Sequence, residues 1–403
     1  MLFIWVHRET VVAAMPKIAF VLSLTLSFVT PALAVDVLWT DSTTGQVLRG
    51  QAGGGAAQVL FDAGDYPSAP SVVAPFGIIA DEDFVYWSDS LTGEILRGSL
   101  NGQGPATLLF DRADYPGELA FARPTGLAID DSFIYWADSA TGSVLRASKN
   151  GSGVVTTLYT AADYPGAPTQ IFPWDVTVFG GQLYWSDSGV SQILTGATDG
   201  SSAVQTLFTS ASGRVNLGLA IDGGEVYWGD TDNADFEGRV VGGSLSGGGS
   251  PEVLYDLTDY PSLVTSGAPT GVAAQSGQLY WIDSLTKQVL TASASGAGEI
   301  SILFDIGDYP GSPSYISPTF LTVVSTSYDA DFNDDGAVDG NDFLLWQRGH
   351  SPAPLSAGDL ALWKEQYGEV PLLTSVQAVP EPLAITLALV TCLGAFVISR
   401  RCH

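Results

Sequence analysis

Residues 331 to 342 have the residue types and the spacing of a calcium-binding loop. Ca²⁺ prefers oxygen ligands, which such a loop supplies from side chains at positions one, three, five, nine and twelve and from the carbonyl of position seven. These positions are occupied by Asp331, Asn333, Asp335, Asp339, Asp342 and, for the carbonyl, Ala337. Gly336 permits the sharp turn, and a helix over Phe343–Arg348 is expected next. The pattern predicts one bound Ca²⁺, the alternative being an acidic turn without a ligand.

A second acidic pattern joins aspartate, tyrosine and proline. It occurs five times, as Asp65-Tyr66-Pro67, Asp114-Tyr115-Pro116, Asp163-Tyr164-Pro165, Asp259-Tyr260-Pro261 and Asp308-Tyr309-Pro310. A further position has Ser210–Arg214 instead. Gathered around one opening, these loops could bind a cation, a peptide or a sugar. Alternatively, each tyrosine packs inward while Asp-Pro shapes a turn. Repetition favours the second interpretation, because a single pocket seldom needs five copies.

A third acidic stretch, Asp230–Gly238, contains Asp232, Asp235 and Glu237. Clustered carboxylates of this kind can hold Ca²⁺. The spacing matches no established calcium loop, however, so a solvated acidic loop is the favoured interpretation.

Histidine and cysteine lie outside the central region of the chain. The histidines are His7, His350 and His403, and the cysteines are Cys392 and Cys402. Residues 35–327 therefore contain no Cys–His or Ser–His catalytic pair, no histidine-ligated metal and no disulfide. Carboxylate-pair glycoside chemistry remains open because acids are plentiful, but nothing singles out a pair. We expect no enzyme.

The elements that must position these loops belong to a sixfold repeat. A tetrapeptide reading Leu-Trp-Thr-Asp in the first unit and Tyr-Trp-x-Asp in the others has its tryptophans at Trp39, Trp87, Trp136, Trp185, Trp228 and Trp281. Successive tryptophans are 48, 49, 49, 43 and 53 positions apart. Each unit contains four short β-rich runs separated by Asp-Ser, Thr-Gly and Asn-Gly turn signals. Four strands in a unit of this length are typical of a propeller blade.

The first run of each unit is offset from the tetrapeptides along the chain. Its copies are Pro75–Ala80, Pro124–Ile129, Pro173–Val178, Asn216–Ile221, Pro269–Ala274 and Pro318–Val323. The first unit thus begins at its tetrapeptide, and a spare first run follows the sixth. Pairing of Pro318–Val323 with Val37–Thr40 would close the ring and remove an open sheet edge. The sequence therefore predicts six complete blades.

The six spaced tetrapeptides resemble the YWTD propeller of the low-density-lipoprotein receptor family. The resemblance covers about Val35 to Val324 and implies an extracellular six-bladed domain, often used to recognise proteins or other ligands. It also implies that the repeated residues build the fold, with aromatic rings between blades and aspartates tying neighbours together. These residues are the six tryptophans above with Asp41, Asp89, Asp138, Asp187, Asp230 and Asp283.

The chain is strongly acidic, with 43 Asp and Glu against 15 Lys and Arg, for a formal charge of -28. Such a surface repels nucleic acid and anionic membranes and attracts cations. We therefore expect no nucleic-acid partner, and the simplest purpose of the charge is solubility.

Both ends of the chain have the features of targeting signals. Residues 1–34 are predicted to be a secretory signal, since Lys17 precedes the apolar stretch Ile18–Val29 and Ala32-Leu33-Ala34 forms a cleavage site. Met15 is a possible true start. Export in this way would place the central region outside the cytoplasm.

The last residues, 379–403, combine three features. Pro380-Glu381-Pro382 precedes an apolar run from Leu383 to Ser399, and Arg400 and Arg401 close it. The run is barely long enough for a membrane-spanning helix, and the arginines would stay cytoplasmic. The order resembles the PEP-CTERM sorting signal, which implies an exosortase-type membrane peptidase as partner, transient anchoring in the inner membrane and delivery to a Gram-negative cell surface. An ordinary C-terminal anchor is the alternative.

The calcium loop resembles half of a dockerin, whose twelfth position is Asp. A second half should follow, and Asp359–Trp363 resembles the end of its loop and its helix. The preceding Ser351–Gly358 lacks the earlier ligands, so residues 328–368 are expected to hold one Ca²⁺. This departure puts binding of a cohesin in question, and a self-packed, calcium-stabilised helical stalk is an alternative of at least equal weight.

The sequence thus predicts an all-β, six-bladed propeller over residues 35–327, a small α-helical calcium module, a linker over 369–378 and a C-terminal transmembrane helix. The leading functional hypothesis is an exported, non-catalytic cell-surface or extracellular-matrix protein, whose propeller recognises a protein or polysaccharide or acts as a scaffold. The alternatives are a secreted carbohydrate-active enzyme and a component of a dockerin-mediated assembly.

Overall fold

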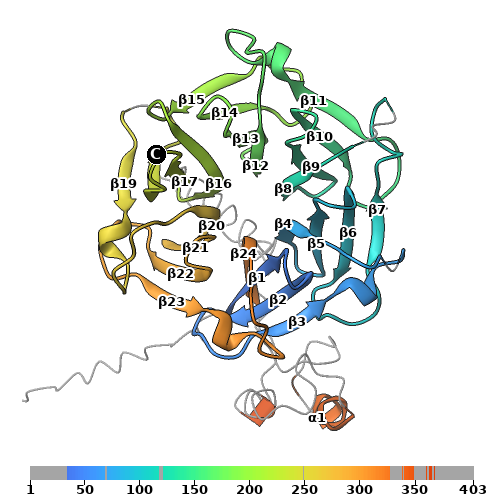
Figure 1. The fold of residues 1–403 in the computed structure, drawn as a ribbon. Coiled ribbons are helices and arrows are strands. Elements are labelled where there is room, and N and C mark those ends of the chain that lie inside the picture. Colours follow the sequence, from blue (N-terminus) through green and yellow to red (C-terminus); the bar gives the residue numbers. More distant parts are fainter. Residues whose placement is uncertain are drawn as a thin grey trace, which may run out of the picture. The chain divides into compact units, whose positions relative to one another are not determined.

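The computed structural model describes residues 34–68, 70–117, 121–247 and 249–326 and, in the C-terminal part, residues 338, 340–348, 360, 363, 364 and 367. The described residues before position 327 form six four-stranded antiparallel sheets. These sheets stand around a common axis as the blades of a propeller (Figure 1). The predicted all-β, six-bladed architecture is confirmed.

Each blade has strands A to D, counted from the axis outward. The A strands of blades one to six are β24 (Pro318–Thr326), β4 (Pro75–Ala80), β8 (Pro124–Ile129), β12 (Pro173–Phe179), β16 (Arg214–Asp222) and β20 (Pro269–Gln275). The B strands are β1 (Ala34–Asp41), β5 (Phe84–Asp89), β9 (Phe133–Asp138), β13 (Gln182–Asp187), β17 (Glu225–Asp232) and β21 (Gln278–Asp283). The C strands are β2 (Gln46–Gln51), β6 (Glu94–Ser99), β10 (Ser143–Ser148), β14 (Gln192–Ala197), β18 (Gly238–Ser244) and β22 (Gln288–Ser293). The D strands are β3 (Gln58–Phe61), β7 (Thr107–Phe110), β11 (Thr156–Thr160), β15 (Gln205–Thr209), β19 (Glu252–Tyr255) and β23 (Ser301–Phe304). Short 3₁₀ turns follow four D strands: η1 (Ala63–Asp65), η2 (Ala161–Asp163), η3 (Leu257–Asp259) and η4 (Ile306–Asp308).

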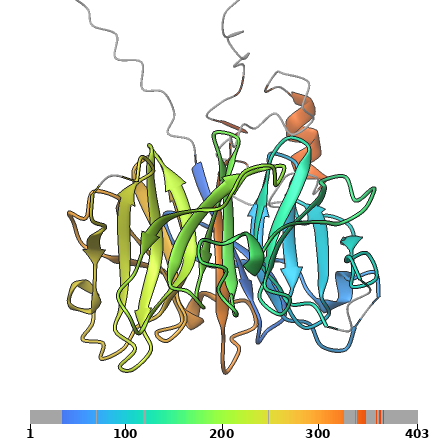
Figure 2. The same ribbon diagram turned by 90° about the horizontal axis from the view of Figure 1, so that it is seen from above.

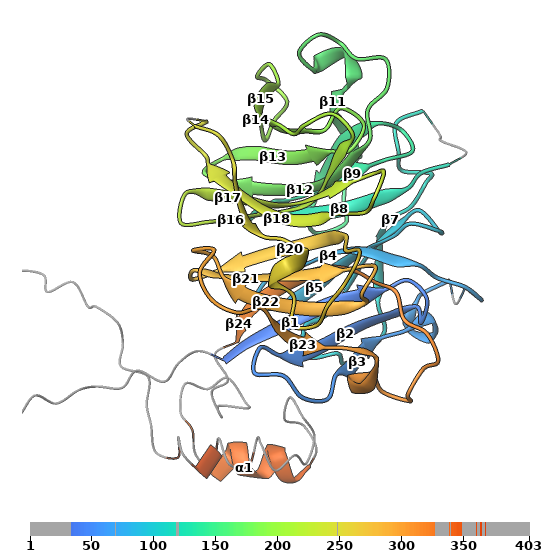
Figure 3. The ribbon, with the colours of Figure 1, turned by 60° about the vertical axis from the view of Figure 1, so that its left-hand side comes forward.

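The ring closes through blade one, which combines the two ends of the repeat region. Its strand order is β24-β1-β2-β3, and β24 pairs with β1 from Ala34↔Thr326 to Asp41↔Pro318. The two strands lie side by side in Figure 3. This is the pairing predicted from the offset of the repeats, and it covers the edge of β1 that would otherwise be open.

Stacked aromatic rings fill the space between neighbouring blades. The last aromatic residue of each D strand stacks on the B-strand tryptophan of the next blade, and all six tryptophans are buried. The pairs are Phe304–Trp39 (4.7 Å between ring centroids), Phe61–Trp87 (5.1 Å), Phe110–Trp136 (6.0 Å), Tyr159–Trp185 (5.1 Å), Phe208–Trp228 (5.3 Å) and Tyr255–Trp281 (5.8 Å). Offset stacking of this kind adds about 0.5–1.5 kcal/mol per pair to the burial of the rings.

The A strands approach one another closely around the axis. A Cβ on Gly77 would lie 2.0 Å from the Thr125 carbonyl oxygen of the next A strand, so only glycine fits there. Blades four and one depart from this glycine, carrying Asp175 and Phe320 at the equivalent positions. The Phe320 ring contacts the Phe76 and Trp174 rings at centroid distances of 5.2 and 6.4 Å, and Phe76 and Trp174 are 5.5 Å apart. Three aromatic rings from three blades thus occupy the axis near the start of the A strands.

The described residues of the C-terminal part include helix α1 (Gly340–Gln347). It overlaps the predicted helix Phe343–Arg348 but begins three residues earlier. The Phe343 ring contacts the rings of Trp346 and Trp363 at 5.5 and 4.8 Å. Among the described residues, none of the helices has the length and apolar character needed to cross a membrane.

Candidate recognition face

The blades place two sets of connections on one face of the propeller. Because neighbouring strands are antiparallel, the B–C turns and the D–A loops lie at the same end of every sheet. Figure 2 shows the strands running between the two faces. We call the face formed by the B–C turns and D–A loops the loop face. The paired ends of β1 and β24, Ala34 and Thr326, lie at the opposite face.

On the loop face, each Asp-Tyr-Pro tyrosine turns inward to the following blade. Tyr66, from the loop after blade one, donates its hydroxyl to Asp89 Oδ2 (3.1 Å) and accepts from Trp87 Nε1 (2.9 Å). The same Asp89 oxygen accepts the backbone N–H of Ala74 (2.9 Å), and its other oxygen accepts Leu91 N and Thr92 N of the B–C turn. One hydroxyl and one carboxylate therefore tie a D–A loop, a B–C turn and two blades together.

We call these hydrogen bonds among tyrosine, aspartate and tryptophan the tyrosine lock. It recurs with both bonds at Tyr164 and Tyr260 and in part at Tyr309, while Tyr115 occupies the equivalent place. Tyr164 donates to Asp187 Oδ2 (2.9 Å) and accepts from Trp185 (2.7 Å), and Tyr260 does the same with Asp283 (2.7 Å) and Trp281 (3.4 Å). Tyr309 accepts from Trp39 (2.8 Å), and the ring of Tyr115 lies 5.7 Å from that of Trp136. All five tyrosines are buried.

Burial keeps these hydroxyls neutral. It raises the pKa of Tyr66 and Tyr164 well above the ordinary value, and the charges of Asp89 and Asp187 raise it further. Burial also raises the pKa of the Asp187 carboxyl, against hydrogen bonds that lower it. The tyrosine is thus a permanent donor to the aspartate, and the Asp-Tyr-Pro elements are part of the fold. Of the two interpretations drawn from the sequence, inward packing is the one observed.

The aspartates that precede these tyrosines also form hydrogen bonds, within the loop itself. The Asp62 side chain accepts Gly64 N (2.7 Å), while Asp65 Oδ2 accepts Asp62 N (2.9 Å), closing a capping box. The same box is present at η2, η3 and η4. The repeated acids therefore shape turns, which removes them from consideration as a shared cation-binding ring.

The junction between blades four and five is different, because the loop after blade four lacks the tyrosine. There the buried Arg214 Nε pairs with Asp230 Oδ1, and Arg239 Nη2 approaches Asp230 Oδ2 at 3.1 Å. Arg214 also donates to the Glu237 carbonyl oxygen (2.6 Å) and lies 3.7 Å from Asp232. The acidic stretch Asp230–Gly238 is thereby organised around a guanidinium group, which the sequence alone did not reveal.

The loop face carries most of the exposed large apolar side chains of the described propeller. Nine of fourteen belong to its turns and loops: Val72, Leu91, Phe121, Phe172, Phe236, Leu263, Leu285, Ile306 and Tyr315. Val154 and Phe179 lie at the opposite face, and the remaining three are on outer strands. Leu263 is fully exposed. Exposed apolar groups mark an interaction surface where they form a contiguous patch, so the loop face, which carries most of them, is the candidate surface of this propeller.

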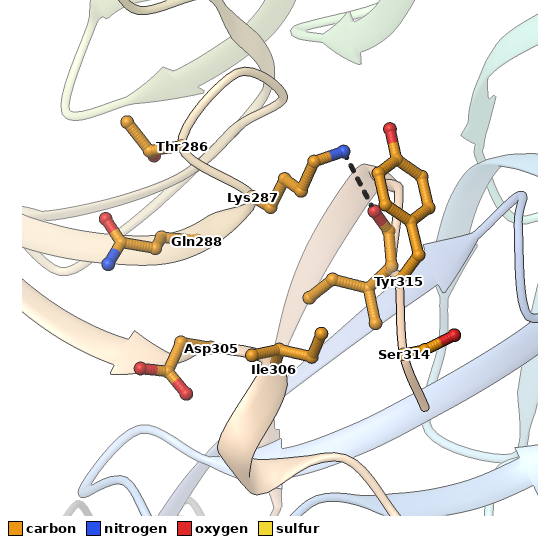
Figure 4. A pocket seen from close by; sticks show the side chains of 8 residues that line it. Thr286, Lys287, Gln288, Asp305, Ile306, Ser314 and Tyr315 are labelled. Atoms are coloured by element: carbon orange, nitrogen blue, oxygen red, sulfur yellow. Dashed lines mark hydrogen bonds between the residues drawn. The ribbon is translucent and has the colours of Figure 1, made fainter. Parts of the chain in front are cut away.

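A pocket of about 260 Å³ opens on this face between the B–C turn of blade six and the loop after it. Its lining includes Lys287, Gln288, Asp305, Tyr315 and Ile316 (Figure 4). The Lys287 ammonium lies 3.6 Å from the centroid of the Tyr315 ring and donates to the Ile316 carbonyl oxygen (3.1 Å). The pocket joins a cation, an aromatic wall and an apolar floor.

The other predicted site residues are placed as follows. The tetrapeptide tryptophans and aspartates are all buried at blade junctions. Asp331, Asn333, Asp335, Ala337, Asp339 and the sorting residues Pro380, Glu381, Pro382, Arg400 and Arg401 lie outside the described residues. Asp342 lies in α1, with only its backbone described. The pocket residues Lys287 and Tyr315 were missed, although Lys287 stands where three other repeats have the glycine of a Thr-Gly turn.

No family profile matches the chain, and no curated protein sequence matches it. Solved structures do resemble it in fold. A chain from the crystal structure of a nidogen/laminin complex has a TM-score of 0.55 at 20% identity, covering 73% of this chain and 99% of that chain. A streptogramin B lyase has a TM-score of 0.42 at 16% identity, covering 57% of this chain and 68% of its own. PQQ-bound aldose sugar dehydrogenase from Streptomyces coelicolor has a TM-score of 0.44 at 15% identity, covering 62% and 94%. At 20% identity the likeness to the chain of the nidogen/laminin complex supports the propeller fold and nothing finer.

Proposed function

We propose that the chain is an exported, non-catalytic protein of a cell surface or extracellular matrix whose propeller recognises a protein through its loop face. The observation that carries the proposal is the concentration of exposed apolar side chains on that face. A polysaccharide-binding surface would need convergent polar groups, whereas Val72, Phe121 and Leu263 offer apolar contact area.

The placement of the chain ends supports the same function. Ala34 and Thr326 lie at the opposite face, so a tether continuing from either residue leaves the loop face free for a partner. The export signal, the exosortase-processed tail and the transient membrane anchor remain proposals from the sequence. So does the Ca²⁺ module, which α1 supports in that it overlaps the exit helix expected over Phe343–Arg348.

Two matched charge insertions test the recognition face. Leu263→Glu alters a fully exposed side chain of the loop face, and Val154→Glu alters one that is 80% exposed at the opposite face. Neither change removes buried contacts, so both variants should fold. We expect Leu263→Glu to release the protein from the surface of the producing cells into the medium, and Val154→Glu to be retained like the parent. Equal retention of both variants would reject the loop face as the recognition surface.

A further inference from the structure

We propose that the pocket beside Lys287 binds a carboxylate side chain, an aspartate or glutamate flanked by apolar residues, of a protein partner. The inference deepens the proposed function and rests on it for the identity of the partner as a protein. Its starting point is the Lys287 ammonium, which lies within 4 Å of none of the described carboxylates. Three arginines, Arg97, Arg112 and Arg146, are likewise half-buried against an aromatic ring with none of the described carboxylates within 4 Å. Lys287 differs from Arg97 and Arg146 in lining a pocket, where a carboxylate brought by a ligand can pair with it.

The backbone at Lys287 is strained. Its φ is +63°, in the left-handed region that disfavours residues with a Cβ. The equivalent B–C turn positions in blades one, two and three are Gly45, Gly93 and Gly142, with φ of +71°, +78° and +63°. Blade four has Ser191 at the equivalent position, with φ of +57°, so the turn favours glycine but accepts other residues. Of the two residues with a Cβ at this position, lysine has the larger side chain, and it is the one that lines the pocket. Strain of this kind is concentrated at binding and active sites.

Blade two builds a similar arrangement from different positions. There the basic residue is Arg112 of the D–A loop, which donates to the Leu91 carbonyl oxygen of the B–C turn (2.5 Å). Its guanidinium lies 5.9 Å from the Phe121 ring, which occupies the repeat position of Tyr315. Gly93 makes room for it, since a Cβ there would lie 2.6 Å from Arg112 Nε. Both blades thus place a cation beside an exposed aromatic ring. In blade six the B–C turn supplies the cation, and in blade two the D–A loop supplies it.

The remaining lining of the pocket defines the ligand. Tyr315 and Ile306 of the lining are 54% and 41% exposed and form an apolar rim, and Leu285, 43% exposed, lies in the adjoining B–C turn. The Asp305 carboxylate, which accepts Gly307 N (2.7 Å), lies at the other end of the pocket from the ammonium in Figure 4. A ligand carboxylate would pair with Lys287 and avoid Asp305, while apolar neighbours cover the rim. A sugar acid would leave the rim uncovered, so we favour a peptide side chain.

Lysine signals in the intact protein provide a direct test. Lysine occurs four times in the chain, at Lys17, Lys149, Lys287 and Lys364. The lysines of the protein are labelled with ¹³C at their ε carbons and observed by NMR. Addition of the peptide acetyl-Ala-Leu-Glu-Leu-Ala-amide should shift the Lys287 signal until the site is saturated. Lys149, paired with Asp81 at 3.1 Å, should not move. The glutamine version of the peptide should bind at least ten-fold more weakly. Equal shifts with both peptides, no shift with either, or a shift with glucuronic acid alone would overturn the proposal.

Two variants separate binding from loop stability. Lys287→Gly installs the residue used in three other blades, so its urea midpoint should equal or exceed that of the parent. Because this variant has no Lys287 signal, its binding of the glutamate peptide is followed by saturation-transfer NMR, and that binding should be lost. Tyr315→Val installs the residue of blade one, Val72, and should weaken the peptide several-fold while the Lys287 signal still responds. A destabilised Lys287→Gly variant that still binds the peptide would make Lys287 a loop clamp only.

The outcome is distinguishable from that of the proposed function. If the peptide fails to bind while Leu263→Glu still releases the protein from cells, the loop face stands and only the pocket assignment falls. If the peptide binds at Lys287 while Leu263→Glu is retained normally, the pocket stands and recognition through the wider face falls.

Discussion

Two types of polar contact hold the B-strand aspartates of this propeller. In five blades the aspartate lies beside a tyrosine of the preceding D–A loop, whereas in blade five Asp230 pairs with Arg214 at the start of the A strand of the same blade. Both types keep the aromatic stack, as Phe208–Trp228 matches Tyr159–Trp185. The hydrogen bonding differs. Trp185 donates to Tyr164, but Trp228 Nε1 has no partner among the described residues, and Asp230 is held by Arg214 instead. The comparison shows that the stack suffices to join two blades, while the polar lock can be built in more than one way.

A second substitution occurs between blades four and five, near the axis. Asp175 of blade four accepts the backbone N–H of Leu219 in blade five (2.7 Å) and that of Val176 (2.8 Å). The neutral tyrosine lock is thus replaced by an arginine at the face and an aspartate at the axis. A buried ion pair makes stability sensitive to mutation, and a buried titratable carboxyl makes it sensitive to pH, so this region should respond to both.

The largest effect is expected from removing the guanidinium of this junction. Arg214→Ala leaves the buried Asp230 with Arg239 alone and should reduce the free energy of unfolding by about 3–5 kcal/mol in urea denaturation. Lys149→Ala breaks the more exposed pair with Asp81 and should cost at most about 1 kcal/mol. Similar losses for the two variants would remove the distinction between this junction and an ordinary surface pair.

The next effect is a dependence on pH that originates from Asp175. Burial raises the pKa of its carboxyl to about 8, against an ordinary value of 3.8. Between these values the folded protein holds a proton that the unfolded chain has released, so this group favours folding most at low pH. Its contribution falls by about 1.4 kcal/mol per unit as the pH rises from 4 to 8.

Asp175→Asn should remove that slope. Urea midpoints should be measured at unit intervals from pH 5 to 8. The midpoint of the parent should fall as the pH rises, and that of the variant should change less. The slope is diagnostic rather than the absolute stability, because the amide loses one acceptor for the two backbone N–H groups. Parallel pH profiles would show that the carboxyl is not protonated in the folded protein.

A smaller effect compares two tryptophans. Trp185→Phe loses ring area and the bond to Tyr164, whereas Trp228→Phe loses ring area only. The first variant should therefore be less stable by about 1 kcal/mol relative to the second, as measured by thermal or chemical denaturation. A larger loss at Trp228 would mean that the blade four–five junction depends on that indole N–H after all.

Much of this fold could be predicted because each blade corresponds to one repeat of the sequence. The tetrapeptides fixed the B strands, and the spare run Pro318–Val323 identified the closing strand. Arg214 and Asp230 could not be paired in advance, because their contact depends on how two strands of one blade are placed. Lys287 and Asp175 each replace a glycine of the repeat, a signal in the sequence that was missed. Their meaning, a cation beside a pocket and a buried acid, appears only when neighbouring loops and A strands are placed.

The central claim is that the repeated residues build the ring and that exposed, unrepeated residues of the loop face recognise the partner. It is tested most directly by comparing Tyr164→Phe with Leu263→Glu for both unfolding free energy and retention on the producing cells. Tyr164→Phe should lose about 1–3 kcal/mol, because Trp185 and Asp187 lose a buried partner, and should be retained normally. Leu263→Glu should keep its stability and be released. Release of a folded Tyr164→Phe variant together with normal retention of Leu263→Glu would contradict the account.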